Sequence, residues 1–419
     1  MIPPPHTPAR RVLEATSTAA TLMPGYGEAD HSKLRPLLGA SRFGGAFGYN
    51  PFTLYAANAV SSPNALVLGK IGNGKSALVK AYLARMLAYG YPALVIDPKG
   101  EYRALAERFG EGVVTLMRGG EGVNPFVPPS IGDSASALEF NCEMAERAIE
   151  ALTGHPVSAL EGASVRSVLG ALGDEVGFLA LRRGLAELDE RGGPVEWLGE
   201  YQKGSLAEAV VALDRLLQSG LVSAGERAGS LASRLGKGIV AVDLSAAFGS
   251  SLYSLAATMV LASVRALQLR PGSPRVVVAV DEIWALAEEP EAARWLRSYW
   301  KLSRALGIAN LGVTHRLSDL RQGAGAGSAG LLQDSETIVT FAMEQGDAEA
   351  ICHERGLAPE LARTIARLPK GSALWQFGKS VCVVDHILTR TERRICDTDA
   401  RLRGDGPEPG FIALGENPL

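Results

Sequence analysis

The sequence predicts an α/β fold with a mostly parallel central sheet. Short apolar segments typical of buried strands alternate with amphipathic segments typical of helices over most of the chain. A glycine-rich turn lies between one such strand and helix, and an acidic pair follows a later strand. The chain has 419 residues, 47% of them apolar, which is enough for one large core or two to three smaller ones.

Individual elements follow from the period of the apolar residues. The segment 65–69 is expected to be a strand, and 75–90 a helix that Gly90 closes. Further strands are expected at 92–98, 112–116, 238–244, 275–284, 308–315 and 336–343. Further helices are expected at 252–269 and 291–307. The segment 371–389 has the pattern of a β-hairpin, with the turn Phe-Gly-Lys-Ser between two strands rich in β-branched and aromatic residues.

The alternation stops between residues 131 and 236, where only helical patterns occur. This stretch has 9 Lys and Arg against 16 Asp and Glu, so it is acidic and is not expected to lie along DNA. We interpret it as an all-α insertion that divides the α/β core into 61–130 and 237–403. Residues 1–60 are interpreted as a loose leader and a segment that covers the nucleotide site, and 404–419 as a disordered tail.

Composition excludes several classes of protein. The net charge of −3 supplies no overall attraction to nucleic acid or to an acidic membrane. The four cysteines form no C-x-x-C pair, so we expect free thiols rather than a disulfide or metal framework. No apolar run reaches the roughly 18 to 20 residues of a spanning helix, and the N-terminus lacks the pattern of a signal peptide. We therefore expect a cytoplasmic protein, with docking on a membrane complex left open.

The turn 69–76 matches G-x-x-x-x-G-K-[ST] between a predicted strand and a predicted helix. Its glycines let backbone N–H groups surround phosphates, Lys75 offsets their charge, and Ser76 is a ligand for Mg²⁺. The predicted cofactors are therefore ATP and Mg²⁺. The predicted nucleotide-binding residues are Gly69, Lys70, Ile71, Gly72, Asn73, Gly74, Lys75, Ser76 and Ala77.

The strand 275–280 ends in Asp281 and Glu282. Asp281 is predicted to hold the Mg²⁺ shell, and Glu282 to polarise the water that attacks the terminal phosphate. A strand that ends in Asp-Glu is common as a solvated turn, but together with the glycine-rich turn the pair favours hydrolysis.

Two later residues have two interpretations each. His315 at the tip of the strand 308–315 is either a sensor of the γ-phosphate or a satisfied histidine at a strand end. Arg304, eleven residues earlier, is either a finger that reaches the nucleotide of a neighbouring subunit or a cation suited to a helix C-terminus. The aromatic residues Trp295, Tyr299 and Trp300 are spaced as a core or subunit-contact stripe rather than a base-stacking platform. The run 323–330 is read as a plain loop, with a pore loop as the alternative.

The ordered set of motifs resembles the HerA/FtsK superfamily over residues 45–390. Within it, the set is similar to the VirB/TraC-type ATPases that energise conjugation and type IV secretion. The matching elements are the turn 69–76, an Asp-Pro-x-x-Glu-Tyr element at 97–102, Asn-Pro-Phe at 124–126, the helical insertion, and the acidic strand with Arg304 and His315 after it. The resemblance implies a RecA-like P-loop NTPase fold and maps the family's arginine finger onto Arg304.

The chain departs from the family pattern in two places. The family usually has Gln where this chain has His315, and its secretion members have a long N-terminal docking domain where only a short leader precedes residue 69 here. Docking is then the task of another chain, or this is a stand-alone relative with a different task.

Three functions follow from these observations. The first is a ring-forming, Mg²⁺-dependent ATPase, most simply a hexamer, that powers conjugation or secretion of protein or DNA at the inner membrane. The second is a translocase of double-stranded DNA. The third is a scaffold that binds ATP and hydrolyses it slowly.

Overall fold

The computed structural model describes residues 35–42, 44–110, 112–117, 122–131, 133–195, 199–201, 203–223, 230–250, 252–316 and 326–396. The expected tail 404–419, most of the leader and residues 323–325 lie outside these residues. Residues 326–330 are the first residues of a helix, so the expectation of a plain loop is wrong for this part of the run 323–330.

A sheet of eleven strands organises the described chain, in the order β2-β1-β13-β12-β11-β3-β10-β9-β4-β8-β5. From β11 to β5 all neighbours are parallel, and from β11 to β2 they are antiparallel, so the sheet is mostly parallel as predicted. The strands are β1 (Leu37–Ser41), β2 (Ala46–Gly48), β3 (Ala65–Leu68), β4 (Ala93–Asp97), β5 (Gly112–Thr115), β8 (Ile239–Asp243), β9 (Val276–Val280), β10 (Ile308–Thr314), β11 (Thr337–Thr340), β12 (Ser372–Phe377) and β13 (Ser380–His386).

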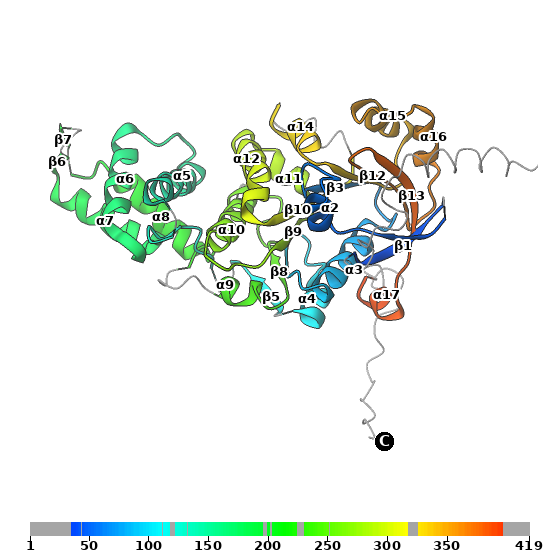
Figure 1. Cartoon of the computed structure of the whole chain (residues 1–419). Helices are drawn as coiled ribbons and strands as arrows, with labels where there is room; N and C mark the ends of the chain where they lie inside the picture. The colour runs from blue at the N-terminus through cyan, green and yellow to red at the C-terminus, as the bar shows by residue number, and fades with distance from the viewer. Residues whose placement is uncertain are drawn as a thin grey trace, which may run out of the picture.

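Helices cover both faces of this sheet (Figure 1). Alternate residues of each parallel strand point to opposite faces, which is why the strands are apolar throughout. One face packs against α2 (Pro51–Ala56), α3 (Lys75–Ala88) and α4 (Arg103–Phe109), and the other against α10 (Leu252–Gln268), α11 (Ile283–Ala287) and α12 (Pro290–Leu306). Trp295, Tyr299 and Trp300 on α12 are all buried, so of the two predicted alternatives, core or subunit contact, these side chains belong to the core.

The insertion forms a lobe at one end of the molecule (Figure 1). Its helices are α5 (Ser134–Thr153), α6 (Ala159–Leu172), α7 (Phe178–Arg191), α8 (Ala207–Ser219) and α9 (Ser230–Leu235), with a short 3-10 turn, η2 (Gly173–Glu175). The expectation of an exclusively helical insertion is wrong in one detail. The strands β6 (Gly193–Val195) and β7 (Gly199–Tyr201) pair as a small antiparallel hairpin, because Gly-Gly-Pro ends α7.

At the antiparallel end of the sheet, strands from the beginning of the described chain lie beside strands from near its C-terminal end. The predicted hairpin is present as β12 and β13, and β1 pairs with β13, so residues 35–60 extend the sheet. No described residue of 35–60 lines the large cleft of the sheet, and residues 1–34, to which the expectation of a covering segment also applies, lie outside the described residues. The remaining helices are α14 (Ala326–Gln333), α15 (Gln345–Glu354), α16 (Glu360–Ala366) and α17 (Arg390–Cys396).

No helix among these described ranges combines the length and apolarity needed to cross a membrane.

Candidate functional site

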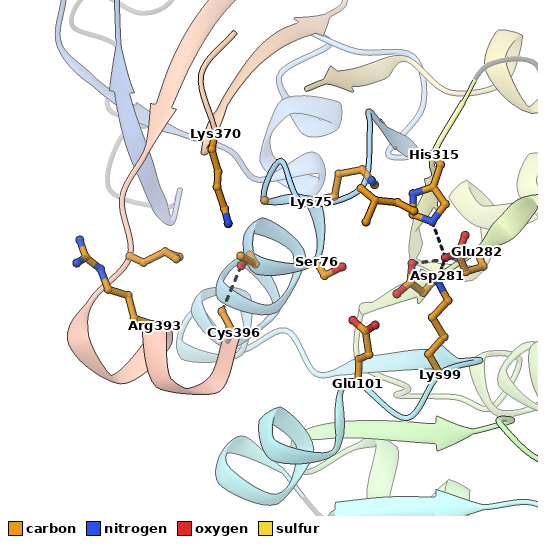
Figure 2. A pocket seen from close by; sticks show the side chains of 15 residues that line it. Lys75, Ser76, Lys99, Glu101, Asp281, Glu282, His315, Lys370, Arg393 and Cys396 are labelled. Carbon is orange, nitrogen blue, oxygen red and sulfur yellow. Dashed lines mark hydrogen bonds and ion pairs between the residues drawn. The ribbon is translucent and has the colours of Figure 1, made fainter. Parts of the chain in front are cut away.

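A cleft of about 490 Å³ lies at the carboxyl ends of the central parallel strands (Figure 2). The crossover connections of a parallel sheet leave this edge open, which is where α/β proteins bind ligands. The predicted residues Lys75, Ser76, Asp281, Glu282 and His315 all line it. Sequence positions more than 200 residues apart are therefore brought to one site.

The glycine-rich turn joins β3 to α3, as the motif predicts. Gly69, Gly72 and Gly74 have φ values of 145°, 82° and 105°, which favour glycine. Gly69 also passes so close to β11 that an added Cβ would lie 2.5 Å from the Cβ of Phe341. The first glycine is thus required for packing as well as for conformation.

The nine predicted nucleotide-binding residues divide into two groups. Those that line the cleft are Ile71, Gly72, Gly74, Lys75, Ser76 and Ala77. The other three fasten the turn to neighbouring segments. Lys70 forms an ion pair with Glu344, and its N–H donates to the carbonyl of Ala342 at 2.9 Å. The carbonyl of Asn73 accepts a hydrogen bond from the N–H of Gly371 at 3.0 Å, at the start of the β12–β13 hairpin.

Lys75 lies beneath the turn and is 5% exposed. Its ammonium donates to the carbonyls of Gly69 at 2.5 Å and Lys70 at 3.0 Å. Burial lowers the pKa of Lys75 to about 8, partly offset by the carboxylates of Glu282 and Asp281. Because phosphate oxygens are stronger acceptors than these carbonyls, the same ammonium is available to an anion in the cleft.

The Asp-Pro-x-x-Glu-Tyr element forms the wall opposite the turn. The buried carboxylate of Asp97 accepts hydrogen bonds from the backbone N–H groups of Lys99, Glu101 and Tyr102 at 3.2, 3.0 and 2.8 Å. The loop is thereby folded around the end of β4, and the side chains of Lys99 and Glu101 line the cleft. Tyr102 is fully buried beneath it. The three hydrogen bonds explain physically why Asp stands at the start of this element.

Asp281 and Glu282 follow β9 directly and are 6% and 2% exposed. Burial raises the pKa of Asp281 to about 6, and the neighbouring charge of Glu282 adds to the effect. The N–H of Glu282 donates to the carboxylate of Asp281 at 3.0 Å. Glu282 itself has φ 49° and ψ 45°, a left-handed conformation that is uncommon for a residue with a side chain. Such strain is typical of functional positions.

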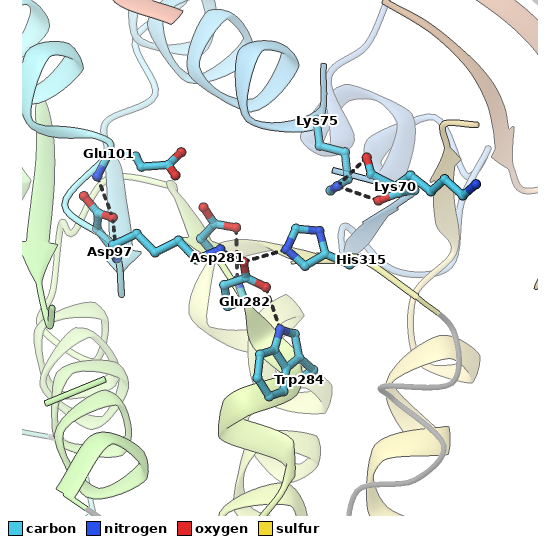
Figure 3. A network of polar contacts seen from close by, with 10 residues as sticks. Lys70, Lys75, Asp97, Glu101, Asp281, Glu282, Trp284 and His315 are labelled. Carbon is cyan, nitrogen blue, oxygen red and sulfur yellow. Dashed lines mark hydrogen bonds and ion pairs between the residues drawn. The ribbon is translucent and has the colours of Figure 1, made fainter. Parts of the chain in front are cut away.

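Both carboxylate oxygens of Glu282 have donors (Figure 3). Oε1 contacts the ammonium of Lys99 and lies 2.7 Å from Nε2 of His315, and Oε2 accepts from the indole N–H of Trp284 at 2.5 Å. Burial by itself would raise the pKa of Glu282, but the hydrogen bonds from His315, Lys99 and Trp284 outweigh it and lower the pKa to about 2. Glu282 is therefore a poor proton acceptor, and its carboxylate is held in place by these donors.

The donor set fits Mg²⁺. A hydroxyl oxygen and a carboxylate oxygen, from Ser76 and Asp281, are hard ligands of the kind this ion prefers, and both line the same cleft. The described residues include no cluster of three His, Cys, Asp or Glu arranged for a metal. Protein ligation would thus come from these two residues, with phosphate oxygens and water completing the shell, and the bound ion would neutralise phosphate charge.

Comparisons with known proteins agree with this site and fold. Residues 49–153 match the family model described as the central domain of helicase HerA. The solved structure of VirB4 of Thermoanaerobacter pseudethanolicus aligns over 85% of this chain and 97% of its own, with 19% identity and a TM-score of 0.65. The chain is therefore similar to the HerA central domain over residues 49–153, and its fold is that of the RecA-like P-loop NTPases. Its RecA-like fold also matches the bacterial conjugative coupling protein TrwB, with 16% identity over 78% of this chain and 85% of that one and a TM-score of 0.51. No curated protein sequence matches the chain.

One predicted site residue, Arg304, is not brought to the cleft. Arg304 lies in the last turn of α12, before β10 begins, and its guanidinium donates to the carbonyl of Ser61 at 3.3 Å. Both groups lie at the amino-terminal edge of the parallel strands, opposite to the glycine-rich turn. Arg304 therefore does not contact the cleft of its own chain.

Sequence reasoning missed several cleft residues. Lys99 occupies an unspecified position within the Asp-Pro-x-x-Glu-Tyr element, and Trp284 was not singled out, yet both bind Glu282. Lys370, Leu388 and Arg393 line the far end of the cleft with no motif around them. The signal that pointed toward Lys99 was its place in the Asp-Pro-x-x-Glu-Tyr element.

Proposed function

We propose that this protein hydrolyses ATP with Mg²⁺ in the described cleft. One observation carries the proposal, the convergence of Lys75, Ser76, Asp281 and Glu282 from two distant segments on one cleft. Lys75 and the backbone of the turn would bind the phosphates, Ser76 and Asp281 would hold Mg²⁺, and Glu282 would orient the attacking water. The structure of TrwB with ADP and Mg²⁺ has a similar fold, with a TM-score of 0.50.

Substitution of single residues tests this assignment. We expect Glu282→Gln to lower the turnover number at least about 100-fold while ATP still binds, because the amide keeps the shape but lacks the charge. Lys75→Ala is expected to abolish ATP binding itself. Steady-state phosphate release and equilibrium binding, measured on the same preparations, separate the two effects. A Glu282→Gln variant with unchanged turnover contradicts the mechanism.

We propose further that the active form is a ring, most simply a homo-hexamer, in which Arg304 acts on the neighbouring subunit's nucleotide. The support is its position at the edge of the sheet opposite to the turn, since this rules out action on its own cleft. Mixing two inactive variants is a direct test. Subunits with Arg304→Ala keep an intact Lys75, and subunits with Lys75→Ala keep an intact Arg304. Activity that appears only on mixing supports the ring, and a mixture as inactive as its parts contradicts it.

We propose conjugation or type IV secretion-type transport as the work that hydrolysis drives, at the cytoplasmic face of the inner membrane and without a membrane span in the described residues. The support is the similarity in fold to VirB4 and TrwB. ATPase assays with and without double-stranded DNA test the alternative. Strong stimulation by DNA that falls steeply with salt favours a DNA translocase.

A slowly hydrolysing, ATP-gated scaffold is a second candidate function. The observation in its favour is that both oxygens of Glu282 are held by Lys99, His315 and Trp284. A turnover number that is near background and indifferent to DNA, protein concentration and Glu282→Gln would support it, whereas the rate losses expected above would exclude it.

A further inference from the structure

The nucleotide cleft has two chemically different ends, on opposite sides of Ser76 (Figure 2). One end holds Asp281, Glu282 and His315. The other end holds α17 with Arg393 and Cys396, and the side chain of Lys370 extends from above toward Cys396. Leu388, two residues before α17 begins, also lines the cleft. No residue of this second end takes part in the proposed hydrolysis.

The orientation of a nucleotide follows from the first end, and the inference therefore rests on the proposed function. The terminal phosphate must lie beside Glu282 for a water to be oriented there, and the turn binds the phosphates over the start of α3. The triphosphate then extends away from Asp281 and Glu282. The nucleoside is directed to the end formed by Leu388 and α17.

The short helix α17 is held firmly enough to form a binding wall. Glu392 accepts two hydrogen bonds of 2.7 Å from the guanidinium of Arg85 on α3, and Arg85 also donates to the carbonyl of Ile387 at 2.8 Å. Thr389 and Glu392 bond to each other's backbone N–H groups at the start of the helix, at 2.7 and 3.2 Å. The pair of Arg85 with Glu392 is largely buried, so α17 is fixed to the same helix that carries Ser76.

The side chains at this end are free to contact a ligand. The structure records no hydrogen bond or ion pair for the side chains of Lys370 and Arg393 within the residues it describes. Leu388 is half-buried and supplies apolar surface, and Arg393 is exposed at the rim. A planar guanidinium stacks on the face of a heterocyclic base, and an aliphatic side chain packs against the ribose or base edge.

We propose that this end of the cleft is the nucleoside subsite, in which Arg393 packs against the base and Leu388 forms the apolar wall. Arg393 and Leu388 are then positioning residues for ATP, with no part in binding its phosphates.

Comparison of two ligands tests this division. One probe is β,γ-imido-ATP and the other is inorganic tripolyphosphate, which has the three phosphates without a nucleoside, both with Mg²⁺ and titrated by calorimetry. For Arg393→Ala we expect the Kd of β,γ-imido-ATP to rise about tenfold while that of tripolyphosphate changes less than twofold. Leu388→Ala should show the same pattern. Arg394→Ala, the adjacent exposed arginine that does not line the cleft, is the matched control and should change neither Kd.

Each outcome supports or overturns the inference. Equal weakening of both ligands by Arg393→Ala makes Arg393 a phosphate ligand and overturns it, as does an unchanged Kd for both. If the unsubstituted protein binds neither ligand, the proposed function fails and the subsite fails with it. If it binds both and is insensitive to Arg393→Ala and Leu388→Ala, only the subsite fails. Thermal unfolding of each variant without ligand shows that the fold is retained.

Discussion

Replacement of Gly69 by alanine is expected to destabilise the protein and weaken phosphate binding together. Gly69 has φ 145°, and a methyl group added at its Cα would lie 2.5 Å from the Cβ of Phe341 and 3.1 Å from that residue's Cα and carbonyl carbon. The unfavourable conformation costs about 1–2 kcal/mol, and the clash with backbone adds about 1–3 kcal/mol because neither segment can move freely. The free energy of unfolding should therefore fall by about 2–5 kcal/mol.

Gly72 is the matched control for this substitution. It belongs to the same turn and has φ 82°, but an added Cβ would meet no atom within 4 Å. Gly72→Ala should thus show only the conformational cost of about 1–2 kcal/mol. Urea unfolding of both variants gives the comparison, with tripolyphosphate titrations as the second readout. Equal losses for Gly69→Ala and Gly72→Ala would refute the argument that contact with Phe341 requires the first glycine.

Three further predictions concern charge and hydrogen bonding. Lys99→Met removes one of the donors that lower the pKa of Glu282 to about 2, so the pKa of Glu282 should rise. The acid limb of the pH profile of kcat/KM should then move to higher pH, and an unmoved limb contradicts this expectation. Burial lowers the pKa of His386 from 6.5 to about 4, so between these two pH values the unfolded chain binds more protons than the folded protein. The free energy of unfolding therefore falls as the pH falls. Between pH 7 and pH 5, urea unfolding should show a decrease in this free energy that is about 2 kcal/mol larger in the unsubstituted protein than in His386→Gln. The side chain of buried Asn64 donates to the carbonyl of Trp300 at 2.8 Å and accepts from the N–H of Asn310 at 3.2 Å. Asn64→Ala should therefore lower the free energy of unfolding in urea by about 2–4 kcal/mol, and a decrease below about 1 kcal/mol contradicts this.

Much of the fold could be predicted because its signals are local. The parallel strands are buried on both faces and therefore read as unbroken apolar runs, and each is separated from the next by a segment long enough for a crossover helix. The glycine-rich turn and the pair Asp281-Glu282 were predicted for the same reason, since each is defined by a few consecutive residues after a strand. The pairing of β9 with β10 then places His315, at the tip of its predicted strand, beside Glu282.

The elements that were missed depend on packing between distant segments. The pairing of β1 with β13 joins residues more than 300 positions apart, and no local pattern encodes it. Lys99 and Glu282 are 183 positions apart, and their contact results from the register between β4 and β9 together with the fold of the Asp97 loop. The place of Arg393 at the cleft depends on the ion pair that holds α17 on α3, again between distant residues.

The donors around Glu282 come from separate elements of the fold. Lys99 belongs to the loop after β4, His315 follows β10, and Trp284 lies on α11. A ligand whose terminal phosphate attracts Lys99 away from Oε1 would leave His315 and Trp284 to hold the carboxylate in place, and would free one acceptor site for water. The same exchange would shift the Asp97 loop relative to β9. Hydrolysis and movement of this loop would then be two consequences of one change of partner, which is what conversion of phosphate energy into motion requires.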